Sequence, residues 1–293
     1  MDIDLRDITI HVRDTGPDTG SGVPVLLLHG WPDDGDLWRH QAPALVGAGY
    51  RAIAPDLRGF GGSGKPAGTA AYTMRHLVGD VVGLLDALGI RAAHLVGHDW
   101  GAAIAWATAM SAAERVSSLT ALSVGHPASF RSAGFRQLEK SWYMLLFQFR
   151  GIAERWLSHD DFRNLREWTG HPDIEPVVRR LSDPAALTAS LGVYRAIVAP
   201  ETLLSPPPEL PPVTAPVMGV WSTGDIALIE KGMTGSARYV KGPWRYERME
   251  DVSHWIPLEA PGPLNALLLD FLATTQQEAV SVACQKCSEP ASE

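Results

Sequence analysis

The stretch Gly97-His98-Asp99-Trp100-Gly101 decides the fold of this 293-residue chain. It follows Ala93 to Val96, a short apolar run typical of a buried strand, and the small residues Ala102 and Ala103 come directly after it. Glycines two residues before and two residues after a central side chain have the spacing of a nucleophile elbow, a sharp strand-to-helix turn. We therefore predict that Asp99 is a nucleophile, exposed at the carboxyl end of a strand.

Comparable apolar runs lie on both sides of this stretch. They alternate with amphipathic segments, which predicts an α/β fold with a mostly parallel sheet flanked by helices. The runs and the polar residues that end them are Val25 to Leu28 before His29-Gly30-Trp31-Pro32, Arg51 to Ala54 before Pro55-Asp56, Leu119 to Val124 before Gly125-His126-Pro127, and Val217 to Trp221 before Ser222-Thr223-Gly224-Asp225. Because ligands bind at the carboxyl ends of strands in such sheets, we expect chemistry at these endings.

Two helices are predicted from their end signals and apolar spacing. Thr73 is suited to the N-cap of a helix that Gly89 closes. Pro263 suits the first helical position of a helix near the C-terminus. The residues expected to form the buried stripe of this last helix are Leu264, Leu267, Leu268, Phe271 and Leu272.

The segment 129–205 differs in composition from its flanks. Trp, Tyr, Phe and Arg at helical spacing replace the strand pattern, and the proline-rich run from Pro206 to Pro212 follows as a stiff return linker. We predict a sheet core formed by 1–128 and 206–273, with 129–205 inserted as a helical lid. The polar stretch 274–293 is predicted to be a disordered tail.

The chain's 2 cysteines, Cys284 and Cys287, both lie in this tail. A zinc site would need two more ligands at suitable spacing, and a thioredoxin-like redox motif would stand at a strand-to-helix turn. The sequence contains no glycine-rich phosphate loop and no ligand-spaced His/Cys cluster. We therefore predict that the function requires neither a metal nor an organic cofactor.

Composition limits the partners. The net charge of −8 is spread along the chain without a Lys/Arg-rich run, which disfavours nucleic acid and membrane surfaces as partners. The N-terminus lacks the basic and apolar regions of a signal peptide, and no apolar stretch is long enough to span a bilayer, so a cytoplasmic location is expected. The sequence does not distinguish a monomer from a homodimer.

An acid and a histidine follow Asp99 along the chain. Asp225 comes after an apolar run, and His254 stands in Asp251-Val252-Ser253-His254-Trp255 ahead of the last helix. Singly, each residue type is more often a turn former or a loop histidine. Together, in the order nucleophile, acid, base, they predict a catalytic triad.

A carboxylate nucleophile indicates which reaction the protein catalyses. Its attack on a saturated carbon forms an ester that water can hydrolyse, whereas a serine would form an ether. Asp99 needs no base for this first step, so His254 can activate water for the second while Asp225 orients its imidazole. The oxyanion of the second step requires two backbone N–H donors, which we assign to Trp31 and Trp100.

From about Val23 to Leu272 the sequence resembles the α/β-hydrolase epoxide hydrolases. The motifs that carry the resemblance are His29-Gly30-Trp31-Pro32, Asp56-Leu57-Arg58-Gly59-Phe60-Gly61-Gly62-Ser63, Gly97-His98-Asp99-Trp100-Gly101 and Ser253-His254-Trp255. The first two are shared across many α/β-hydrolases. The aspartate elbow narrows the resemblance to epoxide hydrolases, haloalkane dehalogenases and haloacetate dehalogenases.

Two lid motifs favour the epoxide hydrolases. The stretch from Ser141 to Phe149 resembles the segment that carries their first ring-opening tyrosine, and Val193-Tyr194-Arg195-Ala196 resembles the second. The resemblance implies that Tyr143 and Tyr194 bind and protonate the epoxide oxygen, which leaves as a basic alkoxide. Arg150 stands where the family usually has proline, a departure that bears on the shape of the lid.

The sequence thus predicts hydrolysis of a small epoxide, of apolar or aromatic character, to a vicinal diol. One alternative is a haloalkane dehalogenase with the same triad, in which Trp100 would hold the halide; Trp31 stands where many of those enzymes have asparagine. The other is a non-catalytic binding protein of the same fold. The intact triad argues against it, because a binding protein has no chemical need for Asp99, Asp225 and His254 together.

Overall fold

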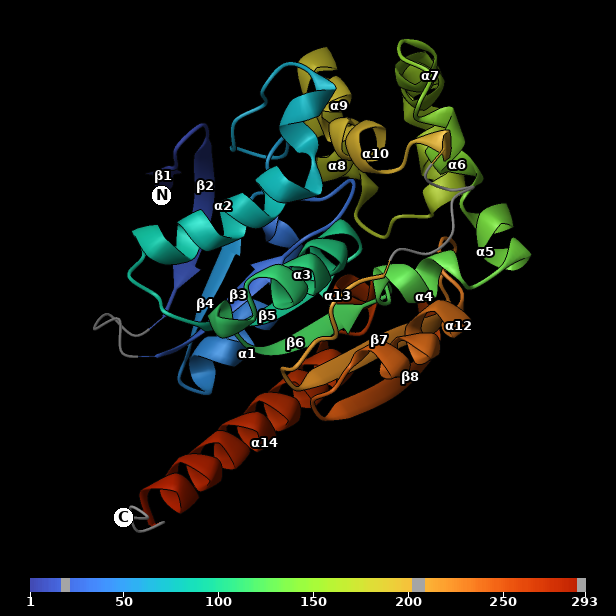
Figure 1. Ribbon diagram of the computed structural model, residues 1–293. Coiled ribbons are helices and arrows are strands. Elements are labelled where there is room, and N and C mark those ends of the chain that lie inside the picture. Colours follow the sequence, from blue (N-terminus) through green and yellow to red (C-terminus); the bar gives the residue numbers. More distant parts are fainter. Residues whose placement is uncertain (17–21, 202–208, 289–293) are drawn as a thin grey trace.

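An eight-stranded sheet forms the centre of the protein (Figure 1). The computed structural model describes residues 1–16, 22–201 and 209–288, with side chains as far as 277. The strand order is β1-β2-β4-β3-β5-β6-β7-β8, and neighbours are parallel except β1 with β2 and β2 with β4. The strands are β1 (Asp2–Asp4), β2 (Thr9–Thr15), β3 (Val23–Leu28), β4 (Tyr50–Pro55), β5 (Ala93–His98), β6 (Val116–Leu122), β7 (Val217–Gly224) and β8 (Trp244–Ser253). This arrangement confirms the predicted α/β class.

Helices cover both faces of the sheet because its central strands are apolar on both sides. In β3, Leu26 and Leu28 belong to one hydrophobic cluster, while Val25 and Leu27 belong to the other. The first cluster includes residues of α2 (Met74–Ala87) and α3 (Trp100–Ser111). The second includes residues of α1 (Gln41–Gly47), α13 (Ile256–Glu259) and α14 (Pro261–Ser288).

The first predicted helix begins where its signal indicates, and the second begins at Pro261, two residues before the predicted start. Thr73 has extended dihedral angles at the N-cap of α2, and Gly89 has a positive φ of 66° just beyond its end. Pro263 lies in the first turn of α14. Four of the five stripe residues are buried, and Leu267 is partly buried against the same cluster.

The end of α14 differs from the prediction. The helix continues to Ser288, whereas the sequence analysis predicts a disordered tail from 274. Residues 274–288 contain no glycine or proline, so no residue with a strong helix-ending conformation interrupts the backbone hydrogen bonds there. The prediction is corrected over this stretch. The side chains of Cys284 and Cys287, and residues 289–293, lie outside the described part of the chain.

The sequence analysis misses three strands at the edges of the sheet. β2 pairs antiparallel with β4, and β1 extends this edge. β8 pairs with β7 at the opposite edge and is largely exposed or partly buried along its length. Edge strands bury fewer side chains than central ones, so Trp244–Ser253 lacks the continuous apolar run by which the central strands were recognised.

In the described part of the connection between β6 and β7, seven helices lie at one end of the sheet (Figure 1). They are α4 (Pro127–Arg131), α5 (Phe135–Lys140), α6 (Trp142–Leu146), α7 (Ile152–Thr169), α8 (Ile174–Leu181), α9 (Pro184–Ser190) and α10 (Gly192–Ile197). We continue to propose that 129–205 forms a lid on the core. Part of the proline run, 206–208, lies outside the described residues. No helix in the described ranges is long and apolar enough to cross a membrane.

Candidate active site

A strained turn carries Asp99 between β5 and α3. Its φ of 52° and ψ of −120° lie in a region that residues with a side chain rarely adopt. A Cβ on Gly101 would lie 2.0 Å from the carbonyl oxygen of Leu28, and a Cβ on Gly97 would lie 2.4 Å from the carbonyl oxygen of Gly101. Close approach of the backbone therefore requires both glycines, and the resulting turn presents the Asp99 carboxylate at the carboxyl end of the sheet.

The turn that follows β3 lies against this carboxylate. A Cβ on Gly30 would lie 2.3 Å from the Cβ of Asp99, so only glycine permits this approach. The backbone N–H of Trp31 donates to Oδ1 of Asp99 at 2.9 Å. The backbone N–H of Trp100 also hydrogen-bonds to Asp99. The two backbone N–H groups that we predict will stabilise an oxyanion thus both lie beside the carboxylate of Asp99.

His254 lies between two carboxylates. Its Nδ1 is 2.9 Å from Oδ2 of Asp225, and its Nε2 is 3.8 Å from Oδ2 of Asp99. The other oxygen of Asp225, Oδ1, accepts the backbone N–H groups of Ala227 and Leu228, each at 2.8 Å. Asp225 is thereby held in one orientation, and the imidazole nitrogen that faces Asp99 is the one available for proton transfer.

The charges of these three groups are coupled. Burial alone would lower the pKa of His254, but the charge and hydrogen bond of Asp225 and the charge of Asp99 raise this pKa to about 8. Burial alone would raise the pKa of Asp225, yet His254 and the two backbone donors lower it overall. Burial raises the pKa of Asp99, and the charge of His254 and the N–H groups of Trp31 and Trp100 offset only part of that rise.

Tyr143 of α6 and Tyr194 of α10 are buried; Tyr143 lines a cavity together with Asp99, and the ring of Tyr194 contacts that of Trp100. Their ring centroids are 5.9 Å apart, and their hydroxyl groups interact with each other. Burial raises the pKa of each phenol well above its ordinary value, and the charge of Asp99 raises both further. Both phenols are therefore protonated at neutral pH, and each can donate a hydrogen bond or a proton to a ligand bound beside Asp99.

A cavity of about 250 Å³ opens beside these residues. Asp99, Trp100 and Tyr143 line one part of it. The rest of its lining is mainly aliphatic and includes Met74, Ala103, Val124, Met144, Ile197, Val198 and Leu228. The tryptophans of the lid, Trp142, Trp156 and Trp168, contact one another instead of lining this cavity. The cavity is therefore mainly apolar; its charged or polar side chains are those of Asp99 and Tyr143 and, in the rest of the lining, Arg131.

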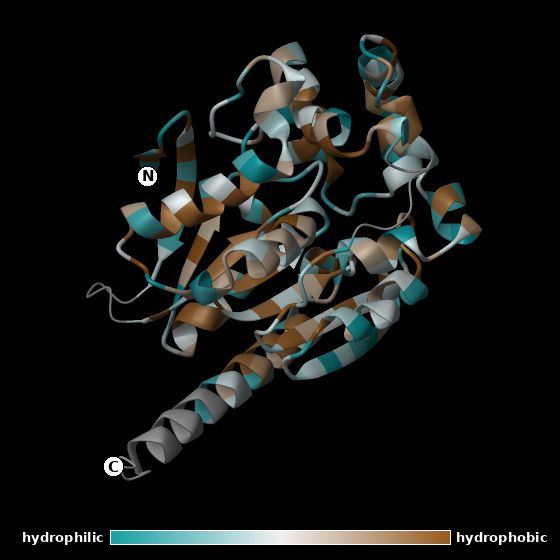
Figure 2. Ribbon diagram, in the orientation of Figure 1, coloured by the Kyte–Doolittle hydropathy of each residue, from teal (hydrophilic) through white to brown (hydrophobic). Residues whose placement is uncertain are grey.

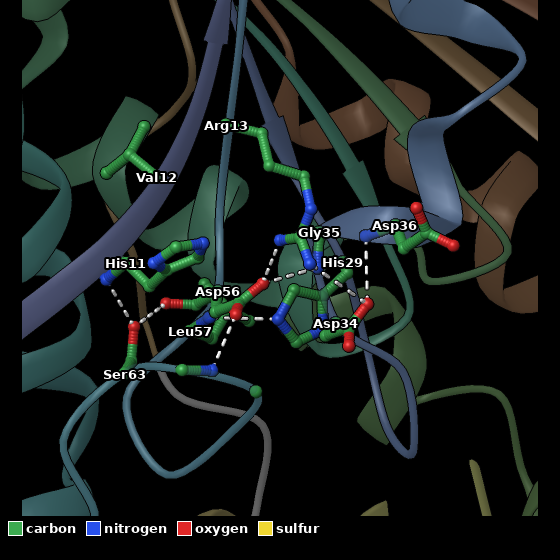
Figure 3. A network of polar contacts seen from close by, with 12 residues as sticks. His11, Val12, Arg13, His29, Asp34, Gly35, Asp36, Asp56, Leu57 and Ser63 are labelled. Atoms are coloured by element: carbon green, nitrogen blue, oxygen red, sulfur yellow. Dashed lines mark hydrogen bonds and ion pairs between the residues drawn. The ribbon is translucent and has the colours of Figure 1, made fainter. Parts of the chain in front are cut away.

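Asp56 ties the site to the N-terminal part of the chain (Figure 3). Its Oδ1 accepts from the guanidinium of Arg13 in β2 and from the backbone N–H of Gly35 at 2.8 Å. Its Oδ2 accepts from the backbone N–H of Gly62 at 2.7 Å. Burial alone would raise the pKa of Asp56, but His29, these N–H groups and Arg13 lower it.

His29 connects this network to the turn beside Asp99 (Figure 3). Its Nε2 accepts from the backbone N–H of Leu57 at 2.8 Å, so its Nδ1 carries the proton and donates to the carbonyl of Gly30 at 2.8 Å. Burial lowers the pKa of His29, which keeps the ring neutral in this role. The sequence analysis quotes His29 and Asp56 in its motifs but assigns them no part in positioning Trp31.

A second set of contacts, absent from the sequence analysis, joins the proposed lid to the core. Asp33 lies two residues after Trp31, and its Oδ1 is 3.0 Å from Nε2 of His171, in the segment between α7 and α8. Its Oδ2 accepts from the indole N–H of Trp255 at 3.1 Å. The sequence offers no signal for these contacts, because the three residues are far apart along the chain and only the fold brings them together.

His98 is a further buried histidine of the site. Its Nε2 is 2.9 Å from the carbonyl oxygen of His254. Burial and the charge of His254 lower the pKa of His98 to about 3, so its ring is neutral and donates through Nε2. It therefore helps to hold the backbone of the loop that carries His254. Among the described residues, no group of three or more His, Cys, Asp or Glu is arranged to hold a metal ion.

The sheet topology and the elbow define the class of this protein as an α/β-hydrolase. The family model described as alpha/beta hydrolase fold matches residues 23–261. Among curated relatives, epoxide hydrolase A of Mycobacterium tuberculosis is 33% identical over 92% of this chain and 96% of its own length. An epoxide hydrolase of Caballeronia sordidicola is 31% identical over 93% of both chains.

Solved structures agree with these relatives. An epoxide hydrolase from metagenomes of hot environments has a TM-score of 0.84 at 32% identity, covering 93% of this chain and 97% of its own. The epoxide hydrolase of Bacillus megaterium, solved with an inhibitor, has a TM-score of 0.82 at 27% identity, covering 93% of this chain and 100% of its own. The chain therefore belongs to the epoxide hydrolase family of the α/β-hydrolases, and it is a hydrolase.

Proposed function

We propose that the protein converts an epoxide into a vicinal diol through a covalent ester on Asp99. The observation that carries this proposal is that two protonated phenols lie at the site: Tyr143 lines the same cavity as Asp99, and Tyr194 contacts Tyr143 and Trp100. An epoxide oxygen needs such donors because it leaves as a strong base. The names of the relatives support the same substrate class.

In the first step, a carboxylate oxygen of Asp99 attacks a ring carbon of the epoxide. A carbon–oxygen ester bond forms, the ring carbon–oxygen bond breaks, and the epoxide oxygen takes a proton from Tyr143 or Tyr194. The enzyme then carries a hydroxyalkyl ester on Asp99 and one tyrosinate. The apolar cavity of about 250 Å³ would hold the carbon substituents of a small epoxide.

In the second step, His254 removes a proton from water, and the resulting hydroxide adds to the ester carbonyl of Asp99. The backbone N–H groups of Trp31 and Trp100 stabilise the oxyanion. Collapse of this intermediate expels the diol oxygen, which takes the proton from His254. The Asp99 carboxyl group then returns its proton to the tyrosinate, so the balance is one epoxide and one water consumed for each diol.

Asp225 supports this second step through His254. Its Oδ2 lies 2.9 Å from the imidazole Nδ1, which leaves Nε2 as the base. The positive imidazolium that forms after proton transfer is stabilised by the carboxylate of Asp225. The role of Asp225 is thus to orient the base and to balance its charge.

The contacts of Trp100 favour epoxide hydrolysis over halide release. The indole N–H of Trp100 hydrogen-bonds to Tyr194. Its ring centroid is 5.0 Å from that of Tyr194. A haloalkane dehalogenase would need this indole donor for the departing halide, whereas here it supports a phenol that serves an alkoxide. We therefore propose no second activity for the site.

One turnover in heavy-oxygen water tests the proposal. Because water attacks the ester carbonyl, the label from the first turnover should appear in the carboxylate of Asp99, detected by peptide mass spectrometry, and the first diol should be unlabelled. Label in the diol alone would exclude the covalent route. A parallel panel of small epoxides and haloalkanes should give diol without halide release; halide release without diol would reassign the enzyme.

A further inference from the structure

The lid carries a stripe of exposed apolar side chains. Of the described large hydrophobic residues that are exposed, all but Met1 and Val23 fall within 135–152. We call them the lid stripe; its members are Phe135, Leu138, Trp142, Leu145, Phe149 and Ile152, between 42% and 72% exposed. Their spacing alternates between three and four residues, as for one face of a helix. Monomeric proteins seldom leave such a row uncovered without a partner.

The backbone keeps most of this stripe on one side. Ser141 links α5 to α6: its N–H donates to the carbonyl of Gln137 at 3.0 Å, and its own carbonyl accepts the N–H of Met144 at 3.0 Å. Tyr143, Met144 and Gln137 are buried on the inner side. The segment is therefore amphipathic, with one side toward the catalytic cavity and the other toward solvent. Hydrophobic residues on α5 and α6 are visible in Figure 2.

Cations border the lid stripe. Five of the seven charged residues from Arg131 to Arg155 are basic, in a chain whose net charge is −8. The two acids are already paired, Glu139 with Arg136 at 3.5 Å and Glu154 with Arg195 at 2.8 Å. Arg150 and Arg155 are exposed and form no ion pair with any residue in the described part of the chain, whereas the ammonium group of Lys140 donates to the backbone carbonyl of Asp225. The stripe is thus an apolar surface with a local excess of positive charge.

We propose that the lid stripe binds the surface of an anionic lipid bilayer. Exposed apolar side chains bordered by Lys and Arg are typical of elements that lie in the membrane interface. A second copy of the chain is a poorer occupant, because a two-fold contact would bring the unpaired cations of both copies together. The absence of a Lys/Arg-rich run disfavours a membrane partner in the sequence, but the exposed Arg150 and Arg155 lie close along the chain to the exposed apolar residues of the stripe.

The position of the stripe connects binding to catalysis. α6 carries Trp142 and Leu145 on its exposed side and Tyr143 and Met144 at the cavity. An apolar cavity suits compounds that partition into lipid. Binding through this side of α6 would hold the cavity next to the bilayer that stores its substrate. The lipid interaction itself does not depend on the proposed chemistry.

Flotation of the full chain with vesicles tests the proposal. The protein should float with vesicles of phosphatidylcholine containing about one third phosphatidylglycerol, and far less with phosphatidylcholine alone or at high salt. The double variant Leu145→Ser/Phe149→Ser should bind anionic vesicles at least about tenfold more weakly, because its apolar contacts are lost. The control Val23→Ser, at a site 40% exposed on the sheet, should bind like the wild type.

A second pair of variants isolates the charges. Arg150→Gln/Arg155→Gln should weaken binding to anionic vesicles roughly tenfold or more, at about 1 kcal/mol for each cation near the surface. Arg91→Gln/Lys241→Gln changes the net charge equally at exposed positions elsewhere and should not weaken it. Thermal unfolding and circular dichroism check that each variant folds. Absence of vesicle binding, or binding indifferent to the stripe, overturns the proposal, as does a stripe-dependent dimer in sedimentation velocity.

Discussion

At the residue scale, the protonation of His254 depends on two carboxylates at once. Asp225 and Asp99 both raise its pKa, which reaches about 8 in the resting enzyme. An imidazole with this pKa is mostly protonated at neutral pH and cannot accept a proton from water. In the proposed mechanism, formation of the ester on Asp99 removes one of these two negative charges. The pKa of His254 then falls, the imidazolium releases its proton to solvent, and the neutral histidine can act as the base of the second step.

This coupling predicts different pH dependences for the two steps. Ester hydrolysis should slow as pH falls below an apparent pKa that is lower than the value of about 8 of the resting enzyme. The alkylation step should not follow that pKa. Single-turnover kinetics can separate the steps through tryptophan fluorescence, since Trp31 and Trp100 border Asp99. An ester-hydrolysis profile with an unchanged pKa of about 8 would contradict the coupling.

The two tyrosines give a second prediction. Tyr143→Phe and Tyr194→Phe should each slow ring opening by roughly a hundredfold or more, and the double variant should nearly abolish it. Hydrolysis of an ester already formed on Asp99 should change little, because His254 and Asp225 perform it. Stopped-flow measurement of both steps checks this split. If the double variant alkylates Asp99 at the normal rate, the two tyrosines have no catalytic role and serve only in packing.

The residues of the candidate site were predictable to the extent that each lies in a short motif. Asp99 and Trp100 stand in the elbow, and Trp31 and His254 stand in their own local patterns. The contact of Asp33 with His171 was not predictable, because neither residue has a local signature and their approach depends on how the lid folds over the sheet.

At the element scale, the approach of α3 to β3 fixes the elbow. Gly101→Ala should destabilise the protein by about 3 kcal/mol or prevent folding, because the new Cβ would lie 2.0 Å from the carbonyl oxygen of Leu28. Urea unfolding measures the loss. Gly79→Ala in α2 is the matched control, since its Cβ would meet nothing within 4 Å and should be neutral or slightly stabilising. Equal effects of the two substitutions would show that backbone approach is not the cause.

The contact between lid and core gives a prediction at the same scale. Burial alone would raise the pKa of Asp33, but His171 and Arg180 lower it to about 2, so the carboxylate is charged and depends on these partners. His171→Leu should remove the nearest of these partners, leaving the more distant Arg180 and the indole of Trp255, and should destabilise the fold by about 2 kcal/mol. Thermal unfolding checks the loss. His159→Leu, an exposed change in the same lid, should have little effect.

Buried strands and helices were easier to predict from the sequence than exposed ones. Central strands such as β3 are apolar on both faces and stand out in the sequence, whereas β2 and β8 lie at edges where polar residues are tolerated. The end of α14 was misplaced for a different reason. Its polar composition indicates exposure to solvent, and exposure alone does not end a helix.

At the scale of the whole molecule, several histidines are buried without a charge. Burial lowers the pKa of His94 and His126 to about 4 each and that of His98 to about 3. They come from different parts of the fold: His94 and His98 lie in β5, and His126 precedes α4. In the unfolded chain each would titrate near its ordinary value of about 6.5. Folding therefore suppresses proton uptake at all three positions.

The sign of this effect follows from proton linkage. Between pH 6.5 and about 4 the unfolded state binds protons that the native state does not, so stability rises with pH and is lost as pH falls. Each such histidine contributes a slope of up to about 1.4 kcal/mol per pH unit. His254 contributes little there, because with a pKa of about 8 it is protonated in both states below pH 6.

The protein should therefore lose stability steeply under mild acid, by up to about 4 kcal/mol per pH unit, before its carboxylates titrate. Urea unfolding at intervals from pH 7 to pH 5 measures the slope. His94→Gln should reduce this slope by up to about 1.4 kcal/mol per pH unit, because the variant lacks one buried histidine that binds a proton only in the unfolded state. Lost packing in this variant would lower stability equally at every pH, so the slope separates the two effects. His159→Gln, at an exposed position, should keep the wild-type slope, and an unchanged slope in His94→Gln as well would show that buried histidines do not cause the acid sensitivity.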